Sequence, residues 1–310
     1  MNKCRFGIAI YIMLLLASTG SARAAVRDNI SIEPFSENLS LVPSQASAST
    51  IIKLTNNSSV ARTFQVNTVD FGSLDETGGL ILLGENATAL QKKYGLTKWL
   101  TVASPSIQVP ARQTANISIL VINRDDLAPG GHYGAVVFTE TDSSPATGEV
   151  GVRQAISTLL FVQKLGGEKY GLTLENVSRD NSWWQTLELK LHFHNAGNID
   201  VIPRGVVTLI DPLGKVVARG IVNDGSSRVF PEAKRSYTVD LNTISASIIP
   251  GQYKIKVQYR YDGKSSFETY NTSLYYFNFW GSVLSVILLA IIIFAIRLLM
   301  NLSRNRRRRI

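Results

Sequence analysis

The chain has 310 residues and a formal net charge of +9, and 45% of its residues are hydrophobic. A basic chain often binds nucleic acid. However, nine of its 32 Lys and Arg residues lie in the two ends, where no acidic residue occurs, and the remaining 23 balance the 23 Asp and Glu residues. The excess charge therefore indicates targeting and anchoring segments, and it excludes nucleic acid as the expected partner.

The N-terminus has the pattern of a signal peptide. Lys3 and Arg5 precede an apolar stretch over residues 6–17, and Ala22-Arg23-Ala24 fits a signal-peptidase site before Ala25. We predict a cleaved signal peptide over residues 1–24, and the alternative is an uncleaved membrane anchor. The one cysteine, Cys4, precedes the apolar stretch. The mature chain would therefore have no disulfide, thiol catalyst or cysteine-bound metal.

The exported region, residues 25–278, reads as strands throughout. Apolar and polar residues alternate cleanly over 187–194 and 253–262, which places every apolar side chain on one face of a strand. Many short strands separated by turn residues indicate antiparallel sandwiches. We predict an all-β fold of two tandem immunoglobulin-like β-sandwiches, residues 25–166 and 167–276, which touch and form a stiff stalk.

One strand departs from the simple alternation. Phe64 and Val66 share a face, whereas Val69 and Phe71 fall on the opposite one, so we expect a β-bulge near Asn67 to restore the inward face.

Two local elements are also predicted outside the ends. Residues 211–214, Asp-Pro-Leu-Gly, indicate a hairpin between the apolar runs 206–210 and 216–218. The one helical candidate covers about residues 87–94.

The C-terminal region has the pattern of a membrane anchor. Residues 279–296 contain no charged side chain, and at ~1.5 Å per residue such a helix crosses a hydrocarbon core of ~30 Å. We predict a transmembrane helix over 277–298 and a basic cytoplasmic tail over 299–310, which makes the protein a single-pass cell-membrane protein whose N-terminal domains are extracytoplasmic. The alternative, a cleaved wall-sorting signal, would need a Leu-Pro-x-Thr-Gly motif, and none precedes residue 279. The expected anchoring residues are Trp280, Arg297, Arg304, Arg306, Arg307, Arg308 and Arg309.

Chemistry-bearing residues are sparse. His192 and His194 share the solvent face of one strand, but no third ligand is evident in the sequence, so ordinary surface residues are favoured over a metal site. The carboxylates are scattered, and no Gly-x-Ser-x-Gly elbow occurs. We therefore predict no catalytic, cofactor or metal site, and no enzyme. Trp183 and Trp184 are the candidate binding residues, since an exposed pair would stack on sugars or contact a partner. Packing of one ring on a core is the favoured alternative.

The order of these segments resembles bacterial membrane-anchored surface proteins with tandem immunoglobulin-like domains, similar to an uncharacterised branch of the WxL-interacting protein group. The resemblance is carried by residues 30–34, 52–56, 99–100, 109–113, 128–136, 193–198 and 250–253. It implies a first domain that contacts peptidoglycan and a second that contacts a host or surface protein. The first domain also resembles a pilus-chaperone sandwich, although those chaperones are soluble and this chain is expected to be anchored.

These patterns favour a non-enzymatic, membrane-anchored extracytoplasmic protein that presents two β-sandwich domains to a partner in the cell envelope or cell wall. The first alternative is a structural subunit of an envelope assembly, such as secretion or pilus machinery. The second is a hydrolase of wall polymer, the least favoured of the three, because a small sandwich without a deep insertion is a poor setting for two converging carboxylates.

Overall fold

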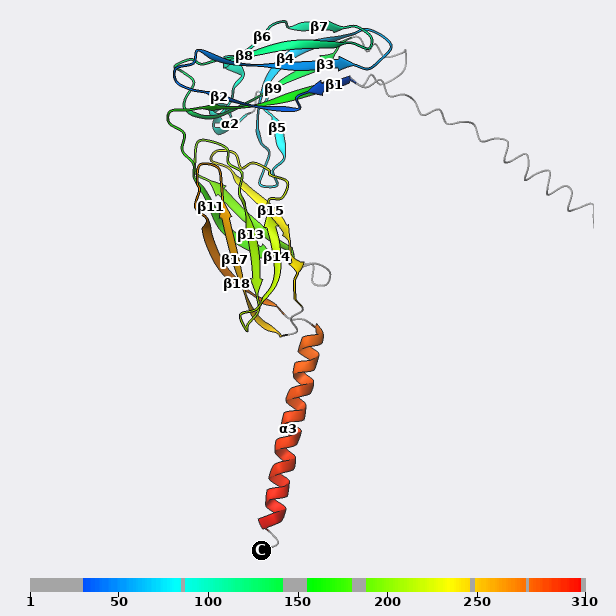
Figure 1. The fold of residues 1–310 in the computed structure, drawn as a ribbon, viewed down its shortest axis with the longest axis vertical. Coiled ribbons are helices and arrows are strands. Elements are labelled where there is room, and N and C mark those ends of the chain that lie inside the picture. The colour runs from blue at the N-terminus through cyan, green and yellow to red at the C-terminus, as the bar shows by residue number, and fades with distance from the viewer. Residues whose placement is uncertain are drawn as a thin grey trace, which may run out of the picture.

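The computed structural model describes residues 30–84, 87–141, 155–179, 188–245, 249–276 and 279–307. Two groups of β-sheets follow one another along the chain, and a long helix extends from the second (Figure 1). The all-β expectation is confirmed. The predicted signal peptide over residues 1–24 and the pair Trp183 and Trp184 lie outside the described residues.

The first group, which we call the N-terminal sandwich, contains two sheets. The four-stranded sheet has the order β1 (Ile30–Glu33), β3 (Ser47–Asn56), β8 (Thr114–Ile122) and β6 (Leu100–Val102). The six-stranded sheet has the order β2 (Ser36–Leu41), β10 (Ala155–Lys164), β9 (Gly130–Glu140), β4 (Arg62–Ser73) and β5 (Leu80–Leu82), with β7 (Ser106–Val109) paired to β4. All of these pairs are antiparallel except that of β2 with β10.

The second group, the C-terminal sandwich, also contains two sheets. One is three-stranded, with β11 (Leu172–Arg179), β12 (Glu188–Asn195) and β15 (Lys234–Asp240). The other is five-stranded, with β16 (Asn242–Thr243), β14 (Val216–Val222), β13 (Arg204–Ile210), β17 (Gly251–Arg260) and β18 (Glu268–Tyr276). None of the four sheets combines strands from both sides of the boundary predicted at residue 166. Whether the two halves are independent domains stays a prediction.

Each sandwich has its own apolar core between its two sheets. In the N-terminal sandwich, Ile52 and Leu54 of β3 face Phe138 of β9 and Leu160 of β10 across that core. Ile51, which precedes Ile52 and faces the other side of the strand, is exposed. The period of two in the sequence therefore separates core from surface as expected for strands buried on one face.

Both predicted local elements are confirmed. β13 and β14 form a hairpin, in which the Asp211 carboxylate accepts hydrogen bonds from the backbone N–H groups of Leu213 (3.0 Å) and Lys215 (2.9 Å). The helical candidate is α2 (Ala89–Lys93), which is followed by a 3-10 turn, η1 (Thr97–Trp99). A capping box between Thr88 and Gln91 starts α2 by satisfying its first N–H groups.

The predicted β-bulge is wrong. β4 pairs with β9 in unbroken register from Phe64 opposite Glu140 to Asp70 opposite Gly134. Phe64 lies in the sandwich core, whereas Phe71, on the opposite face, lies in a second apolar cluster outside that core. The change of face in the sequence thus marks a strand that is buried on both sides, not a strand that is kinked.

A buried asparagine organises the end of β3. The side-chain amide of Asn56 donates to the carbonyls of Val60 (2.8 Å) and Val109 (3.0 Å). Its side-chain oxygen accepts from the backbone N–H of Ser58 at 2.9 Å. The buried asparagine side chain thus holds three backbone groups together at this end of the strand.

The C-terminal sandwich repeats this arrangement at the end of β12. Asn195 donates to the carbonyls of Ile199 (2.8 Å) and Val229 (3.0 Å), and it accepts from the N–H of Gly197 at 2.9 Å. Asn195 therefore corresponds to Asn56, with the same bonds to the second and fourth residues that follow it. The equivalent residues Asn56 and Asn195 are farther apart in the chain than their bonded partners Val109 and Val229, so the sequence shows no fixed-period repeat. This correspondence favours two copies of one kind of sandwich.

We expect Asn56→Ala and Asn195→Ala each to destabilise the protein by about 1–3 kcal/mol, because each removes the side-chain hydrogen bonds to two carbonyls and one N–H at a buried position. Chemical denaturation of the full chain in detergent measures the loss. Asn57→Ala is the matched control, since Asn57 is exposed, and it should change the unfolding midpoint little. Equal midpoints for Asn56→Ala and Asn57→Ala would contradict the role assigned to the buried asparagine.

The C-terminal helix, α3, covers Phe279–Arg307. Its segment Val283–Asn301 has a mean hydropathy of 2.9 and no buried share, so by length and composition it can cross a membrane. Of the predicted anchoring residues, the α3 backbone carries Trp280, Arg297, Arg304, Arg306 and Arg307. Arg308 and Arg309 lie outside the described residues, as do all of these side chains except that of Arg297.

Candidate functional site at the junction of the two sandwiches

An aromatic cluster joins the two sandwiches. Phe230, which precedes β15, inserts among Phe71 of β4, Tyr133 of β9 and Phe161 of β10. Its ring centroid lies 4.7 Å from that of Tyr133, 6.1 Å from that of Phe71 and 6.3 Å from that of Phe161. Only 7% of Phe230 is exposed. The outer face of the six-stranded sheet is thus buried by a residue of the other half, and edge-to-face contacts of this kind add to the burial of area.

A buried polar network lies beside the cluster. The Tyr133 hydroxyl donates to the Asp200 carboxylate at 2.9 Å, and Arg228 forms an ion pair with the other oxygen of that carboxylate. The guanidinium of Arg228 lies 4.4 Å from the Phe161 ring centroid and donates to the side-chain oxygen of Asn38 at 2.7 Å. Burial, followed by the charge of Asp200, raises the pKa of Tyr133 well above its ordinary value. Arg228 therefore connects Asp200 of the C-terminal half with Asn38 and the Phe161 ring of the N-terminal half.

Further contacts hold the hairpin between β4 and β5 against the C-terminal sandwich. The Glu76 carbonyl accepts from the N–H of Ser236 on β15, the edge strand of its sheet, at 2.7 Å. Gly78 has a φ of +87°, and a Cβ there would lie 2.1 Å from the Arg235 guanidinium carbon. The positive φ favours glycine at this position, and a larger residue would also displace the Arg235 side chain.

The linker between the halves is held by one asparagine. Asn198 donates to the carbonyls of Pro129 and Gly167, both at 3.0 Å, and its side-chain oxygen accepts from the N–H of Lys169 at 2.6 Å. Its own carbonyl accepts from the N–H of Gly131 at 2.8 Å. The expectation that the two halves touch is therefore confirmed at several separate places, and their stiffness relative to each other stays a prediction.

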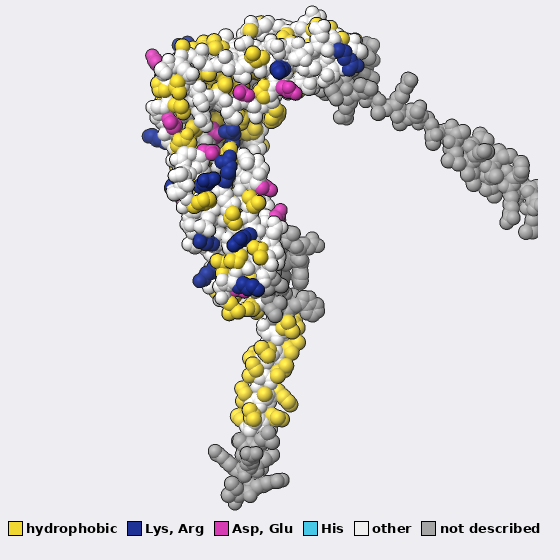
Figure 2. All heavy atoms as spheres, in the orientation of Figure 1, with side chains coloured by type: hydrophobic (Ala, Val, Ile, Leu, Met, Phe, Trp, Pro, Cys, Tyr) yellow, Lys and Arg dark blue, Asp and Glu magenta, His cyan; other side chains and the backbone are white. Residues whose placement is uncertain are grey.

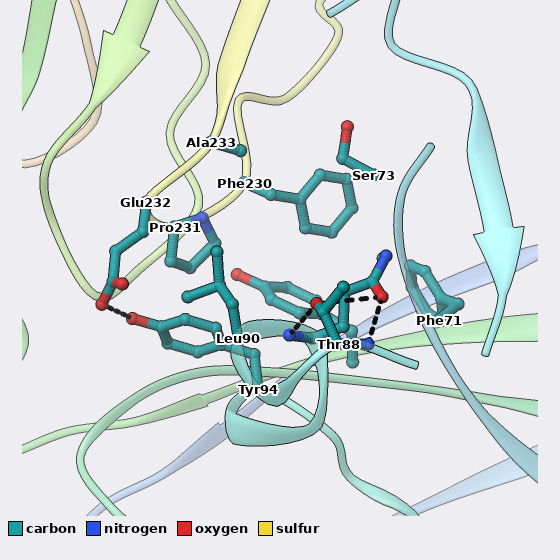
Figure 3. Close-up of a pocket in the computed structure, with 12 residues that line it drawn as sticks. Phe71, Ser73, Thr88, Leu90, Tyr94, Phe230, Pro231, Glu232 and Ala233 are labelled. Atoms are coloured by element: carbon teal, nitrogen blue, oxygen red, sulfur yellow. Dashed lines mark hydrogen bonds between the residues drawn. The ribbon is translucent and has the colours of Figure 1, made fainter. Parts of the chain in front are cut away.

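A cavity of about 180 Å³ opens at this junction, between α2 and the turn before β15 (Figure 3). A cavity of ~150 Å³ accepts a benzene-sized ligand, so this one has room for a single large apolar side chain. Its walls are mostly apolar, and their polar groups lie near α2 and the turn. The lining residues are Phe71, Gly72, Ser73, Thr88, Leu90, Gln91, Tyr94, Tyr133, Phe230, Pro231, Glu232 and Ala233.

An ion pair and a hydrogen bond fix one side of the cavity. Glu232 accepts from the Tyr94 hydroxyl at 2.7 Å (Figure 3). It also accepts from the Lys93 ammonium at 2.5 Å, so α2 and the turn before β15 are held together. The hydrogen bond from Lys93 lowers the pKa of the Glu232 carboxyl, and the same bond raises the pKa of Lys93. Because both groups are largely solvated, their contribution is to position the wall of the cavity more than to stabilise the fold.

An exposed apolar strip borders the cavity. It consists of Leu80, Ile81 and Leu82 on β5 together with Leu74 from the preceding hairpin, and all four side chains are exposed. β5 pairs with the stretch of β4 that lines the cavity, and β5 ends the order of its sheet. Its outer edge therefore presents backbone donors and acceptors beside apolar side chains, which is the arrangement that binds an added strand.

The predicted candidate binding residues stay a prediction, because the structure does not describe them. Trp183 and Trp184 lie outside the described residues, and the side chain of Trp280 does as well. No residue type in the cavity wall marks a site in a sequence, because apolar and aromatic residues also build cores. The one signal of this second buried face in the sequence is the change of face between Val66 and Val69, for which a bulge is the local interpretation.

The two histidines take part in hydrogen bonds across the three-stranded sheet. His192 bonds through Nε2 to the Ser178 hydroxyl (3.0 Å) and through Nδ1 to the Ser236 hydroxyl (2.8 Å). His194 lies 3.5 Å from the Glu175 carboxylate. Within the described ranges, no group of three or more His, Cys, Asp or Glu residues is placed to hold a metal ion. His192 and its serines lie on a sheet face and do not line the junction cavity.

Comparisons with known proteins give only distant matches. No family model matches the chain, and no curated protein is similar to it. Among solved structures, the class 5 fimbriae chaperone CfaA is 14% identical, over 79% of this chain and 99% of that chain, with a TM-score of 0.43. A chain of the Salmonella enterica SafA pilin–SafB chaperone complex is 11% identical, over 79% and 96%, with a TM-score of 0.39. The E. coli chaperone DraB is 13% identical, over 79% and 98%, with a TM-score of 0.37. Scores at this level assign neither family nor activity to this chain.

We expect Phe230→Ala to lower the free energy of unfolding by about 3–5 kcal/mol, because it removes the ring at the centre of the junction and leaves a cavity. Denaturant titration of the full chain in detergent measures the change. Phe35→Ala is the matched control, since Phe35 is 70% exposed, and its effect should stay within about 0.5 kcal/mol. If both variants unfold like the wild-type protein, the junction is not a stabilising interface.

His132 of β9 makes stability depend on pH. Its ring is buried near the linker, with Nε2 2.8 Å from the Ala128 carbonyl and Nδ1 3.3 Å from that of Gly95. Burial lowers its pKa below the usual 6.5. The unfolded chain therefore binds the proton more readily, so the stabilisation is complete above pH 6.5 and is lost as the pH falls toward the folded pKa.

Thermal unfolding between pH 7.5 and pH 5 (a range of about 2.5 units that includes the usual histidine pKa) tests this pH dependence. In this range we expect the midpoint of the wild-type protein to fall more steeply than that of His132→Gln, which has no titrating group at this position. Parallel pH profiles for the two proteins would show that His132 is not the group responsible.

Proposed function

We propose that the chain is a non-enzymatic, single-pass membrane protein whose two immunoglobulin-like sandwich domains, residues 25–166 and 167–276, lie outside the cytoplasm and bind a partner of the cell envelope or cell wall. The signal-peptide pattern of residues 1–24 and the apolar helix α3 support export followed by anchoring. The arginines that follow the apolar segment support a cytoplasmic C-terminus.

The observation that carries the binding role is the junction itself. A cavity that holds one large apolar side chain lies beside an exposed apolar strip and a free strand edge. This combination fits an extended polypeptide that adds backbone hydrogen bonds along β5 and inserts one side chain into the cavity. The partner of this protein is therefore proposed to be an envelope protein that presents such a segment, and a wall polymer is the alternative partner.

Site-specific photo-crosslinking in intact cells tests the proposal. A photoreactive residue at Leu82 on β5, or at Leu90 beside the cavity, should form a covalent adduct with a discrete envelope component. The control position is Ile51, which is exposed on β3 of the opposite sheet, and it should give no such adduct. The same adducts from Ile51 and Leu82, or none from Leu82 and Leu90, would reject the junction as the binding site.

An anchor exchange separates this function from its alternatives. If the protein is instead a structural subunit whose helix makes the contacts, replacement of residues 279–310 by an unrelated anchor should abolish the adducts. A binding role of the sandwiches predicts that the adducts persist. Hydrolysis of peptidoglycan fragments by the purified full chain would favour the wall-hydrolase alternative and contradict the non-enzymatic one.

A further inference from the structure

The end of the C-terminal sandwich from which α3 leaves carries exposed apolar side chains. Leu213 is 77% exposed, Tyr275 is 68% exposed and Ile244 is 58% exposed. Figure 2 shows hydrophobic side chains at this end of the body and around α3, with Lys and Arg side chains above them. Large apolar residues with such exposure at one end of a domain are typical of an interaction surface.

Strand pairing places these residues along one edge. Tyr275 lies opposite Gln252 at the start of β17. The neighbouring Gly251 packs against Pro212 of the β13–β14 turn, since a Cβ there would lie 3.1 Å from the proline Cγ. On the other side of that turn, the N–H of Ile244 donates to the Val217 carbonyl of β14 at 2.8 Å. We call this edge, with Leu213, Ile244, Tyr275, Lys215 and Lys254, the base.

The base carries positive charge on the side of the five-stranded sheet. Lys215 follows the β13–β14 turn and Lys254 lies near the start of β17, and both are exposed. Among the described residues, neither takes part in an ion pair within 4.0 Å. Of the acidic residues at the same end, Asp211 is buried in the β13–β14 turn, and Glu188 and Asp240 lie opposite each other on the three-stranded sheet. Anions are therefore favoured beside the five-stranded sheet.

The distance to the membrane is short. Only two residues separate the end of β18 at Tyr276 from the start of α3 at Phe279, so these two ends lie at most about 11 Å apart. If α3 crosses the bilayer, as the proposed function requires, the base faces the lipid headgroups directly. Exposed aliphatic and aromatic side chains flanked by lysines are the composition that suits this layer, because rings and ammonium groups are stable at the boundary between apolar and aqueous phases.

We propose that the base is a lipid-binding surface: Leu213, Ile244 and Tyr275 insert at headgroup depth, while Lys215 and Lys254 contact anionic headgroups of the outer leaflet. The C-terminal sandwich then stands on the membrane and does not swing from α3. The two sandwiches meet at the opposite end of that sandwich (Figure 1), so the junction cavity is held at a fixed height above the lipid. This inference rests on the membrane anchoring of the proposed function.

Fluorescence quenching of the full chain in vesicles of phosphatidylcholine and phosphatidylglycerol tests it. In a Cys4→Ser background, an environment-sensitive dye is attached at Leu213→Cys, with Tyr275→Cys as a second reporter. Leu80→Cys, at the junction, is the exposed control, and Ile291→Cys, within α3, is the control for insertion. We expect the dye at positions 213 and 275 to be quenched by lipid spin-labelled near the headgroup and shielded from iodide, and the dye at position 80 to behave in the opposite way.

The outcomes distinguish the lipid-binding base from the membrane anchor. Protection at position 291 together with iodide access at positions 213 and 275 equal to that at position 80 would overturn the lipid-binding base and leave the anchor intact. Iodide access at position 291 would overturn the anchor, and the base with it.

The lysines are tested in the same vesicles. Each lysine near an anionic surface shifts a binding equilibrium about fivefold. Lys215→Glu with Lys254→Glu should therefore reduce lipid quenching at position 213 in vesicles with phosphatidylglycerol, and much less in vesicles of phosphatidylcholine alone. Equal reductions in the two lipids, or none in either, would overturn the role of the lysines. Lys53→Glu, on the distant β3, is the matched control.

Discussion

The structure depends on one sheet that is buried on both faces. Strands β4, β9 and β10 contribute alternate side chains to the core of the N-terminal sandwich and to the aromatic cluster outside it. Phe230, from the other half of the chain, supplies the cover for that outer face. Because an aromatic face of this size is unfavourable in water, the N-terminal sandwich and the turn before β15 need each other. The relation between the two halves, and the cavity between them, follow from this burial.

Polar contacts around the cluster give the junction its specificity. Apolar burial alone allows rings to slide, whereas the Asp200 carboxylate, held by Tyr133 and Arg228, is satisfied in one arrangement only. A buried charge without these partners would be costly. Asn198 and Glu232 add directional bonds at the linker and at α2. The junction thus combines a non-directional driving force with groups that select a single geometry, which is what a preformed binding cavity requires.

The sequence predicted those features that depend on local patterns. Alternation of apolar and polar residues gave the all-β fold, Asp211 and its neighbours gave the hairpin, and an uncharged run gave α3. Features that depend on two segments far apart in the chain were not predicted correctly. Val69 and Phe71 lie on the opposite face from Val66 because Phe230 covers that outer face. Nothing in the local pattern distinguishes such a covered face from a bulge. The cavity escaped prediction for the same reason, because its walls come from strands, a short helix and a turn far apart in the chain.

The central claim is that the Phe230 cluster fixes the two sandwiches relative to each other. Pulsed electron–electron double resonance measures the distance between two spin labels. The labels are placed at Ile51→Cys and Ile221→Cys, exposed positions on different halves, in a Cys4→Ser background. We expect one narrow distance distribution that broadens when Phe230 is replaced by alanine. A broad distribution in the protein with Phe230 intact would contradict this claim.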